Sequence, residues 1–261
     1  MGAAVARAMH LLQYGPRALL LDWLAWPLVG AKAEKLASAT PPVLGASKHS
    51  FMTWFAARAR LTEDWLAESS ARQYVILGAG LDSFAWRQSR GIQVFEVDEP
   101  SLQRWKQQRT TALGLGAPDE LTWVPLDLEQ RQLGEALRAA GVRAAEGVFV
   151  SWLGVIPYLT AEAIGDTLSQ LPPCQLVVAY VPPEDHWGPS ARPIGSHFQA
   201  QVAELGEPWI SLLAPDEVEG VLADASFDVI EDLGATEIEN RYGLPCVHHE
   251  RIALARKDAR V

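Results

Sequence analysis

The chain has 261 residues, a formal net charge of −10 and 49% hydrophobic residues. This length suits one large domain with or without a cap, and the composition is that of a globular protein with a full core, which excludes wholesale disorder. Acidic residues outnumber basic ones by 32 to 22, so binding to the phosphate backbone of a nucleic acid is not expected.

The two cysteines, Cys174 and Cys246, are too few for a disulfide framework or a four-thiolate zinc site. The apolar stretch 18–30 is interrupted by Asp22 and Pro27, and it is too short to cross a bilayer, which takes about 20 apolar residues. No signal-peptide pattern opens the chain. We therefore expect no membrane association and a cytoplasmic location.

The first 70 residues have a helical pattern only. Helices are expected at 3–13, 17–28 and 48–69, the last with apolar residues recurring at helical spacing. We expect residues 1–70 to form an N-terminal helical cap and residues 71–261 to form the ligand-binding domain, the two making one structural unit.

From residue 71 onward, short apolar runs alternate with helical segments. Strands are expected at 73–77, 92–97, 121–126, 147–152 and 175–181, with helices at 101–113, 128–140 and 161–171. This alternation is typical of a parallel sheet with helices on both faces.

The last part of the chain departs from this pattern. Helices are expected at 197–205 and 215–225, and strands at 227–233 and 246–255, joined by a loop without a helix. Two strands joined in this way predict an antiparallel pair. The fold class is therefore α/β, a Rossmann-like sheet of seven strands, mostly parallel with one antiparallel strand. Such sheets bind nucleotide-type ligands at the carboxyl ends of their strands.

A glycine turn follows the first strand. Gly78 and Gly80 allow a sharp turn and close approach of the backbone to a ligand. Asp98 ends the next strand, 98 − 78 = 20 residues after Gly78. At this spacing a carboxylate accepts hydrogen bonds from a ribose, so these three residues are candidates for binding an adenosine cofactor.

The acids near the turn favour one cofactor over another. Ser83 stands where a dinucleotide fingerprint has its third glycine, and Asp82 would repel a pyrophosphate. S-adenosyl-L-methionine carries no phosphate, and its sulfonium and ammonium groups favour nearby acids, so it is the expected cofactor. An NAD-dependent oxidoreductase is the alternative. Asp127 could accept from the adenine amino group with Leu128 over the ring, or it could be a helix N-cap.

The stretches 75–82 and 94–100 resemble the leucine carboxyl methyltransferase family, and more closely its bacterial branch of S-adenosylmethionine-dependent O-methyltransferases. The resemblance extends to residues 58–60, 127–128 and 152–159. It implies a class I methyltransferase fold with a helical lid, and cofactor contacts at Gly78, Asp98, Asp127 and Leu128.

The resemblance also implies basic residues that bind the cofactor. An arginine before the first strand holds the methionine carboxylate in this family. Arg58 matches it best and Arg60 is second. A basic residue in the N-terminal helix is a further family contact, for which Arg7 is a weaker match.

One position departs from the family. Members with carboxyl methyltransferase activity have a glutamate before Gly-Val, where this chain has Leu153. A contact is therefore missing or supplied by a neighbour such as Ser151. The expected acceptor is a carboxylate or hydroxyl of a small molecule, and a non-catalytic adenosine-ligand-binding protein is a further alternative. The oligomeric state is left open.

A hydroxyl acceptor benefits from a general base, whereas a carboxylate needs none. His186 and His197 are the first candidates, because they flank a loop after the fifth strand that could border the acceptor. His248 and His249 are expected in a strand with opposite orientations, so we expect no metal site. The tryptophans of the cap could together wall the acceptor site; they are Trp23, Trp26, Trp54 and Trp65.

Overall fold

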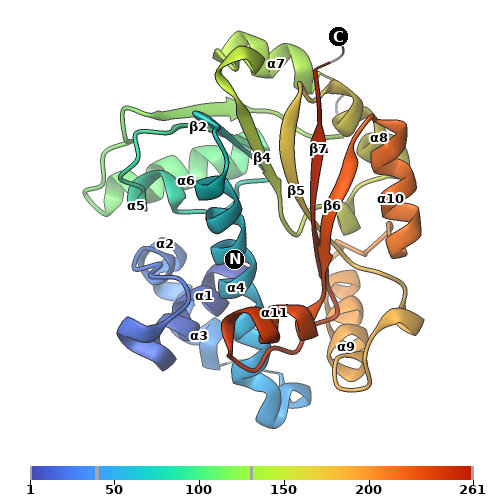
Figure 1. Ribbon diagram of the computed structural model, residues 1–261. Coiled ribbons are helices and arrows are strands. Elements are labelled where there is room, and N and C mark those ends of the chain that lie inside the picture. The colour runs from blue at the N-terminus through green and yellow to red at the C-terminus, as the bar shows by residue number, and fades with distance from the viewer. Residues whose placement is uncertain (1, 39–40, 130–131, 260–261) are drawn as a thin grey trace.

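The computed structural model describes residues 2–38, 41–129 and 132–259, and its centre is one sheet (Figure 1). Within these residues the sheet has seven strands in the order β3-β2-β1-β4-β5-β7-β6. β7 is antiparallel to both of its neighbours, and the pairs among β1 to β5 are parallel. The predicted sheet with one reversed strand is confirmed. The strands are β1 (Gln73–Leu77), β2 (Gln93–Asp98), β3 (Leu121–Pro125), β4 (Val148–Trp152), β5 (Cys174–Tyr180), β6 (Asp228–Leu233) and β7 (Arg251–Lys257).

Helices surround this sheet and form the cap. Those of the cap are α1 (Gly2–Tyr14), α2 (Ala25–Val29), α3 (Ala33–Ser38) and α4 (Lys48–Glu68). Those that follow are α5 (Phe84–Arg87), α6 (Pro100–Ala112), α7 (Leu133–Ala140), α8 (Ala161–Gln170), α9 (Arg192–Glu204), α10 (Pro215–Asp224) and α11 (Ala235–Tyr242).

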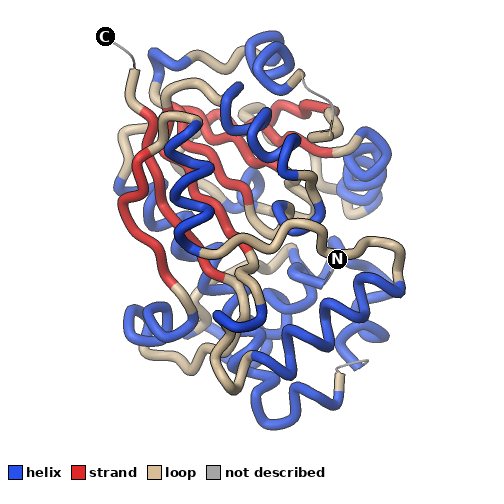
Figure 2. The backbone as a smooth tube through the Cα atoms, turned by 90° about the vertical axis from the view of Figure 1, so that its right-hand side faces the viewer, coloured by secondary structure: helices blue, strands red, loops and turns tan. Residues whose placement is uncertain are grey.

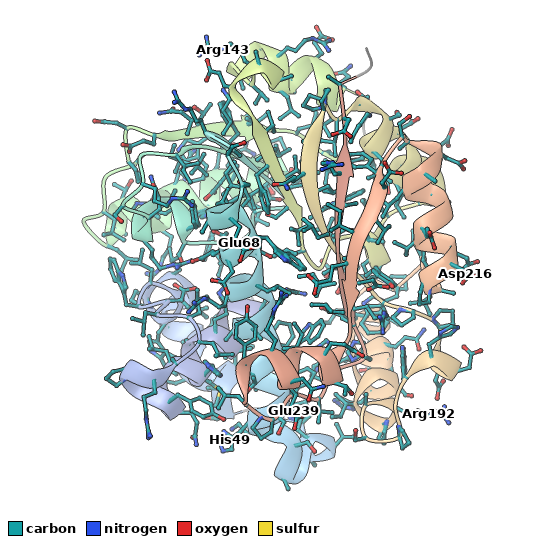
Figure 3. All side chains as sticks on the ribbon, viewed as in Figure 1. His49, Glu68, Arg143, Arg192, Asp216 and Glu239 are labelled. Carbon is teal, nitrogen blue, oxygen red and sulfur yellow. The ribbon has the colours of Figure 1, made fainter. Side chains whose placement is uncertain are left out.

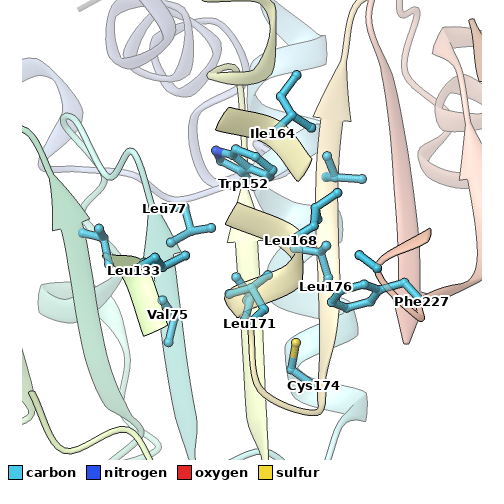
Figure 4. Packing of buried hydrophobic residues seen from close by; sticks show 14 of the residues in the cluster. Val75, Leu77, Leu133, Trp152, Ile164, Leu168, Leu171, Cys174, Leu176 and Phe227 are labelled. Atoms are coloured by element: carbon cyan, nitrogen blue, oxygen red, sulfur yellow. The ribbon is translucent and has the colours of Figure 1, made fainter. Parts of the chain in front are cut away.

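The alternation of side chains along β1 divides the core into two layers. Val75 and Leu77 pack on one face, against residues of α7, α8 and α10. Figure 4 shows this layer, with Trp152, Leu168 and Leu176 side by side across neighbouring elements. Tyr74 and Ile76 face the other layer, with residues of α4, α5 and α11. Burial on both faces explains why β1 is apolar throughout apart from Gln73 at its start.

The cap lies at one end of the molecule, beyond the carboxyl ends of the parallel strands (Figures 1 and 2). The expected boundary at residue 70 falls between α4 and β1. Trp54, Ala57, Leu61 and Trp65 of α4 belong to the same core layer as the sheet, so α4 fastens the cap to the domain. No described helix has the length and apolar character needed to cross a membrane.

Several predicted segments differ from the structure. α11 occupies the segment expected to be a loop between the last two strands. The Glu237 side chain accepts a hydrogen bond from the Gly234 amide at its start, 2.9 Å, and Gly243 ends it with a φ of +68°. Only Ile238 of this helix is buried, so the apolar spacing that marks a helix in a sequence is weak here.

The predicted helix at 17–28 is also wrong, because only α2 forms there as an α-helix, at Ala25–Val29. Asp22 accepts the Ala25 amide and an arginine side chain instead of continuing a helix. The last strand begins at Arg251, five residues after the predicted start at Cys246. The predicted helix 128–140 begins only at Leu133, and residues 130–131 lie outside the described chain.

Candidate cofactor site

A hollow of about 200 Å³ lies at the carboxyl ends of β1 and β4, under the cap. A larger groove of about 500 Å³ lies at the opposite end of β1, lined by residues 69–72 and 90–93 with Glu146. Ligands of open α/β sheets bind beyond the carboxyl ends of the strands, so the smaller hollow is the candidate site. It is lined by Ala3, Ala4, Arg7, Phe55, Arg58, Ala59, residues 76–82, Leu153, Gly154 and Val155.

The glycine turn forms the floor of this hollow. Gly78 has a φ of +65° and donates its amide to the Val97 carbonyl of β2, 2.9 Å. A Cβ at Gly78 would lie 2.3 Å from the Val155 side chain. Gly80 has a φ of +47°. The turn therefore needs glycine both for its backbone conformation and for the close approach of the loop after β4.

Asp98 is fixed to this turn from the end of β2. Its Oδ2 accepts a hydrogen bond from the Gly80 amide at 2.5 Å, and its Oδ1 accepts the Glu99 amide at 2.8 Å. Burial raises the pKa of Asp98, and the two amide hydrogen bonds oppose the rise. The predicted juxtaposition of Gly78, Gly80 and Asp98 is thus present in the structure.

A network of charged side chains joins the cap to the turn. Asp22 is buried and accepts hydrogen bonds from Arg7, at 2.7 Å, and from the Ser83 hydroxyl, at 2.6 Å. Arg87 donates to Ser83 at 2.8 Å and to Glu63 at 2.6 Å. Burial opposes the ionisation of Asp22, but the two arginines hold its pKa below the ordinary value.

Arg7 and Asp82 both line the hollow. Besides its contact with Asp22, Arg7 donates to the Leu81 carbonyl at 2.8 Å. Asp82 accepts the Phe84 amide at 2.7 Å. The formal charge of the acids Asp22, Glu63 and Asp82 with Arg7 and Arg87 is −3 + 2 = −1, which disfavours a pyrophosphate at this turn.

Arg58 of α4 lies on the opposite wall. Its guanidinium packs against Gly154, where a Cβ would lie 3.3 Å from Nη1, and lies 5.3 Å from the centre of the Phe55 ring. Nη1 donates to Glu250 Oε2 at 2.5 Å, and Trp54 Nε1 donates to the same oxygen at 2.8 Å. Arg60, the second candidate, is exposed and pairs with Asp64. Of these two candidates, Arg58 is therefore the one that the fold places at the hollow, where Arg7 of α1 also lies.

Asp98 and three further predicted residues lie outside the lining. Asp127 and Leu128 follow β3, and Asp127 Oδ1 accepts the Glu129 amide at 3.0 Å. Leu128 packs on the core layer of Val75 and Leu77. Ser151 is fully buried in β4, and its hydroxyl lies 2.7 Å from the Tyr74 hydroxyl. The contact of Ser151 with a cofactor stays a prediction that this hydrogen bond does not favour.

Stacked rings fill the space between α4, α9 and the start of β7. We call His248, His249, Phe51, Trp54 and Phe198 the ring cluster. The imidazoles of His248 and His249 stack with centroids 4.2 Å apart, and His248 stacks on Phe51 and Trp54 at 4.8 and 5.1 Å. Phe51 stacks on Phe198 at 5.0 Å. In Figure 3, side chains occupy the region where the ribbons of Figure 1 leave a gap between the cap and the strands.

Both imidazoles are buried without charge. Burial lowers the pKa of His249 to about 4 and that of His248 well below its ordinary value. His248 Nδ1 accepts the Glu250 amide at 3.0 Å, while His248 Nε2 and His249 Nδ1 have no hydrogen-bond partner among the described residues. The expectation that the two rings face opposite ways was wrong, because they precede β7 and do not lie in a strand.

His248, His249 and Glu250 could in principle share a metal, since their ligand atoms lie within 4.8 Å of one another. However, Glu250 Oε2 already accepts from Arg58, and His248 Nδ1 accepts the Glu250 amide. A cation at this point would also be repelled by the guanidinium. The geometry does not favour metal binding.

The tryptophans of the cap do not form one wall, contrary to prediction. Trp54 is fully buried beside Glu250, whereas Trp23 is exposed. Trp65 packs in the core layer of the sheet, and Trp26 packs against α1. Tryptophans separated by irregular turns in the sequence carry no signal of a common orientation.

The two candidate bases also lie apart from the hollow. His186 is exposed in the turn after β5, and His197 is half-buried on α9 with its ring 5.6 Å from that of Phe198. Within the described chain, neither lines the hollow. Their role as bases stays a prediction without support from this geometry.

Sequence reasoning missed Glu250 and the part played by Trp54. Glu250 lies 192 residues from Arg58 along the chain, and no local motif connects the two. A correct start for the last strand, at Arg251, would have placed Glu250 at the carboxyl end of β5, because Arg251 pairs with Tyr180. That register is the signal that could have revealed it.

The seven-stranded sheet and the glycine turn after β1 define a class I methyltransferase fold. A protein of Streptomyces avermitilis from the DUF574 family superposes with a TM-score of 0.62 over 97% of this chain and 96% of that one, at 17% identity. A structure from Thermobifida fusca described as a "putative methyltransferase" gives a TM-score of 0.62 over 98% and 94%, also at 17% identity. These similarities concern the fold.

The sequence model of the leucine carboxyl methyltransferase family matches residues 1–172, and the chain belongs to this family. The "Putative S-adenosyl-L-methionine-dependent methyltransferase YktD" of Bacillus subtilis (strain 168) is 32% identical over 66% of this chain and 59% of its own length. A protein of Parafrankia sp. (strain EAN1pec) with the same type of name is 38% identical over 56% and 50%. The chain thus spans about half to three-fifths of these relatives.

Proposed function

We propose that this protein is an S-adenosylmethionine-dependent O-methyltransferase that acts on a carboxylate or hydroxyl oxygen of a small molecule. The observation that carries the proposal is the hollow beneath the cap. The glycine turn and Arg58 line it at the carboxyl end of β1 and beside the loop after β4, and Asp98, at the end of β2, accepts a hydrogen bond from the turn. The family membership and the names of the relatives support the S-adenosylmethionine-dependent methyl transfer in this proposal, and the acceptor class is our own proposal.

The residues of the hollow fit an adenosine joined to an amino acid. Asp98 would accept the ribose hydroxyls, and Gly78 and Gly80 would let the backbone approach the sugar. Arg58 would bind the α-carboxylate with its guanidinium. Asp127 and Leu128, at the end of β3, would contact the adenine.

When bound, S-adenosylmethionine supplies an electrophilic methyl group, whose bond to sulfur breaks as a bond to the acceptor oxygen forms. The chain contributes position and exclusion of water. Ala3, Ala4 and Arg7 of α1 cover the hollow. Phe55, Leu153 and Val155 present apolar surface beside it. A carboxylate acceptor would need no base in this setting, whereas a phenol or alcohol would benefit from one.

The first test measures binding. Isothermal titration with S-adenosylhomocysteine, and separately with NAD, should show binding of the first and none of the second. Asp98→Ala should reduce S-adenosylhomocysteine affinity by at least a hundredfold, and Asp119→Ala, an acid elsewhere on the chain, should not change it. Binding of NAD alone would contradict the proposal and favour the oxidoreductase alternative.

The second test measures transfer. Purified protein is incubated with S-adenosylmethionine carrying a labelled methyl group and with separate panels of small carboxylic acids and phenols. The products are then treated with alkali, which releases labelled methanol from a methyl ester and leaves a methyl ether intact. Ester product would identify a carboxylate acceptor and ether product a hydroxyl acceptor. Tight cofactor binding with no transfer to either panel would favour the non-catalytic alternative.

A further inference from the structure

Arg58 lies at the wall of the hollow and pairs with Glu250, which is not itself among the lining residues, and this pair joins two distant parts of the chain. Arg58 lines the hollow, and Glu250 accepts its Nη1 at 2.5 Å. Both side chains are largely buried, with 7% and 12% of their surface exposed. Withdrawing an ion pair from water in this way is costly unless further partners satisfy its remaining donors and acceptors.

One oxygen of the Glu250 carboxylate remains available to such a partner. Oε2 accepts both Arg58 and Trp54, which fix the carboxylate from two sides. Oε1 accepts no hydrogen bond from any described residue. Arg58 donates through Nη1 alone within the described chain, so the remaining donors of its guanidinium also stay available. The pair therefore presents one anionic and one cationic edge next to each other.

An α-amino acid carries its ammonium and its carboxylate on one carbon. The two protein groups that bind them must consequently lie within a few ångströms of each other. Arg58 and Glu250 meet this condition. Asp82, the carboxylate that lines the hollow, is not within ion-pair distance of Arg58 and lies at the glycine turn. Leu153, at the end of β4, provides no charge.

We infer that Glu250 binds the α-ammonium of the methyl donor, beside Arg58, which binds its α-carboxylate. The inference rests on the proposed function, because it takes the ligand of the hollow to be S-adenosylmethionine. It assigns the amino-acid end of that ligand to a side chain from the segment before β7. Glu250 then has two tasks: it holds Arg58 in place and it neutralises the ammonium.

The test uses three probes that differ only in this end. S-adenosylhomocysteine has both charged groups, decarboxylated S-adenosylhomocysteine has the amine alone, and 5′-methylthioadenosine has neither. Dissociation constants are measured by isothermal titration for the full chain and for Glu250→Gln, Arg58→Gln and Asp82→Asn. Glu239→Gln is the matched control, because Glu239 is an exposed carboxylate eleven residues away.

Glu250→Gln should raise the dissociation constants of S-adenosylhomocysteine and of its decarboxylated form at least tenfold. It should change the dissociation constant of 5′-methylthioadenosine less than twofold. Arg58→Gln should weaken the binding of S-adenosylhomocysteine far more than the binding of the decarboxylated form. Unchanged binding of 5′-methylthioadenosine also shows that each variant is folded, and Glu239→Gln should bind all three probes as the parent does.

Other results would overturn the inference. An equal loss of affinity for all three probes in Glu250→Gln would mean that Glu250 only stabilises the fold. If Glu250→Gln binds S-adenosylhomocysteine as the parent does and Asp82→Asn loses affinity for it, Asp82 and not Glu250 binds the ammonium. Failure of the parent protein to bind any of the probes would instead refute the proposed function, and the inference with it.

Discussion

The cap is fastened to the domain by different chemistry on the two sides of Arg58. Toward the glycine turn, Arg7, Asp22, Ser83, Arg87 and Glu63 form a buried network of hydrogen-bonded charges. Toward β7, the ring cluster joins α4 to α9 and to the segment before β7. Charged hydrogen bonds specify one geometry, whereas stacked rings tolerate small displacements.

This difference matches what each side has to do in the proposed function. A turn that holds a fixed cofactor needs one backbone conformation. A packed ring cluster outside the lining of the hollow can adjust by moving its rings. The family model ends at residue 172, so it includes the charged network and excludes His248, His249 and Phe198. The four predictions below separate the two sides, from the largest expected effect to the smallest.

Asp22→Ala should be the most damaging change, lowering the free energy of unfolding by about 3–5 kcal/mol, because it leaves Arg7 and Arg87 buried without their shared carboxylate. The measurement is urea unfolding followed by circular dichroism. Glu231→Ala removes a partly exposed partner of Arg241 and should cost at most about 1 kcal/mol. Equal losses in the two variants would show that the network has no special stabilising part.

Gly78→Ala should lower the free energy of unfolding by roughly 2–4 kcal/mol and abolish binding of S-adenosylhomocysteine. Two costs combine: the left-handed backbone and the overlap with Val155. Gly91→Ala is the matched control, since Gly91 has the same φ of +65° and no atom within 4 Å of an added Cβ. It should lose only about 1 kcal/mol and keep binding. If both variants bind normally, the turn does not contact the cofactor.

The ring cluster should affect how the free energy of unfolding depends on pH. The folded protein holds His249 at a pKa of about 4, below the ordinary 6.5 expected in the unfolded chain. Between these values the unfolded chain takes up a proton that the folded chain does not, so stability is full above pH 6.5 and falls as the pH drops toward 4.

His249→Phe should remove this contribution, so that its free energy of unfolding falls less steeply than that of the parent by about 1.4 kcal/mol per pH unit. Denaturant melts at half-unit intervals from pH 7 to pH 4 provide the comparison, and His49→Phe, outside the cluster, should follow the parent. Parallel curves for the parent and His249→Phe would contradict the buried neutral state of this imidazole.

The smallest effect is expected for Phe51→Leu in the ring cluster. Leucine retains most of the apolar surface and the neighbouring rings can repack, so the cost should be about 1 kcal/mol, measured by the same urea unfolding. A loss above about 3 kcal/mol would mean that the rings fit as rigidly as the charges, and the contrast between the two sides would disappear.

The sequence predicted most of the sheet because its strands are short apolar runs between helices. The glycine turn and Asp98 were also predictable, since both belong to one strand-turn-helix-strand unit. Glu250 was not, because it reaches Arg58 only through the pairing of β7 with β5. α11 was missed for a related reason. A helix with one buried residue is stabilised by contacts at its ends and with its neighbours, and such contacts produce no periodic pattern of apolar residues in the sequence.

The position of β7 has a consequence for the order of events during synthesis. β7 lies between β5 and β6, yet it leaves the ribosome after both. Until then β5 has an open edge and β6 has no partner, and open edges favour pairing with other chains. Glu250 arrives with β7. A nascent chain would therefore acquire the turn and Asp98 well before it could hold the amino-acid end of a ligand, and the ligand could favour completion of the sheet by binding only to the finished form.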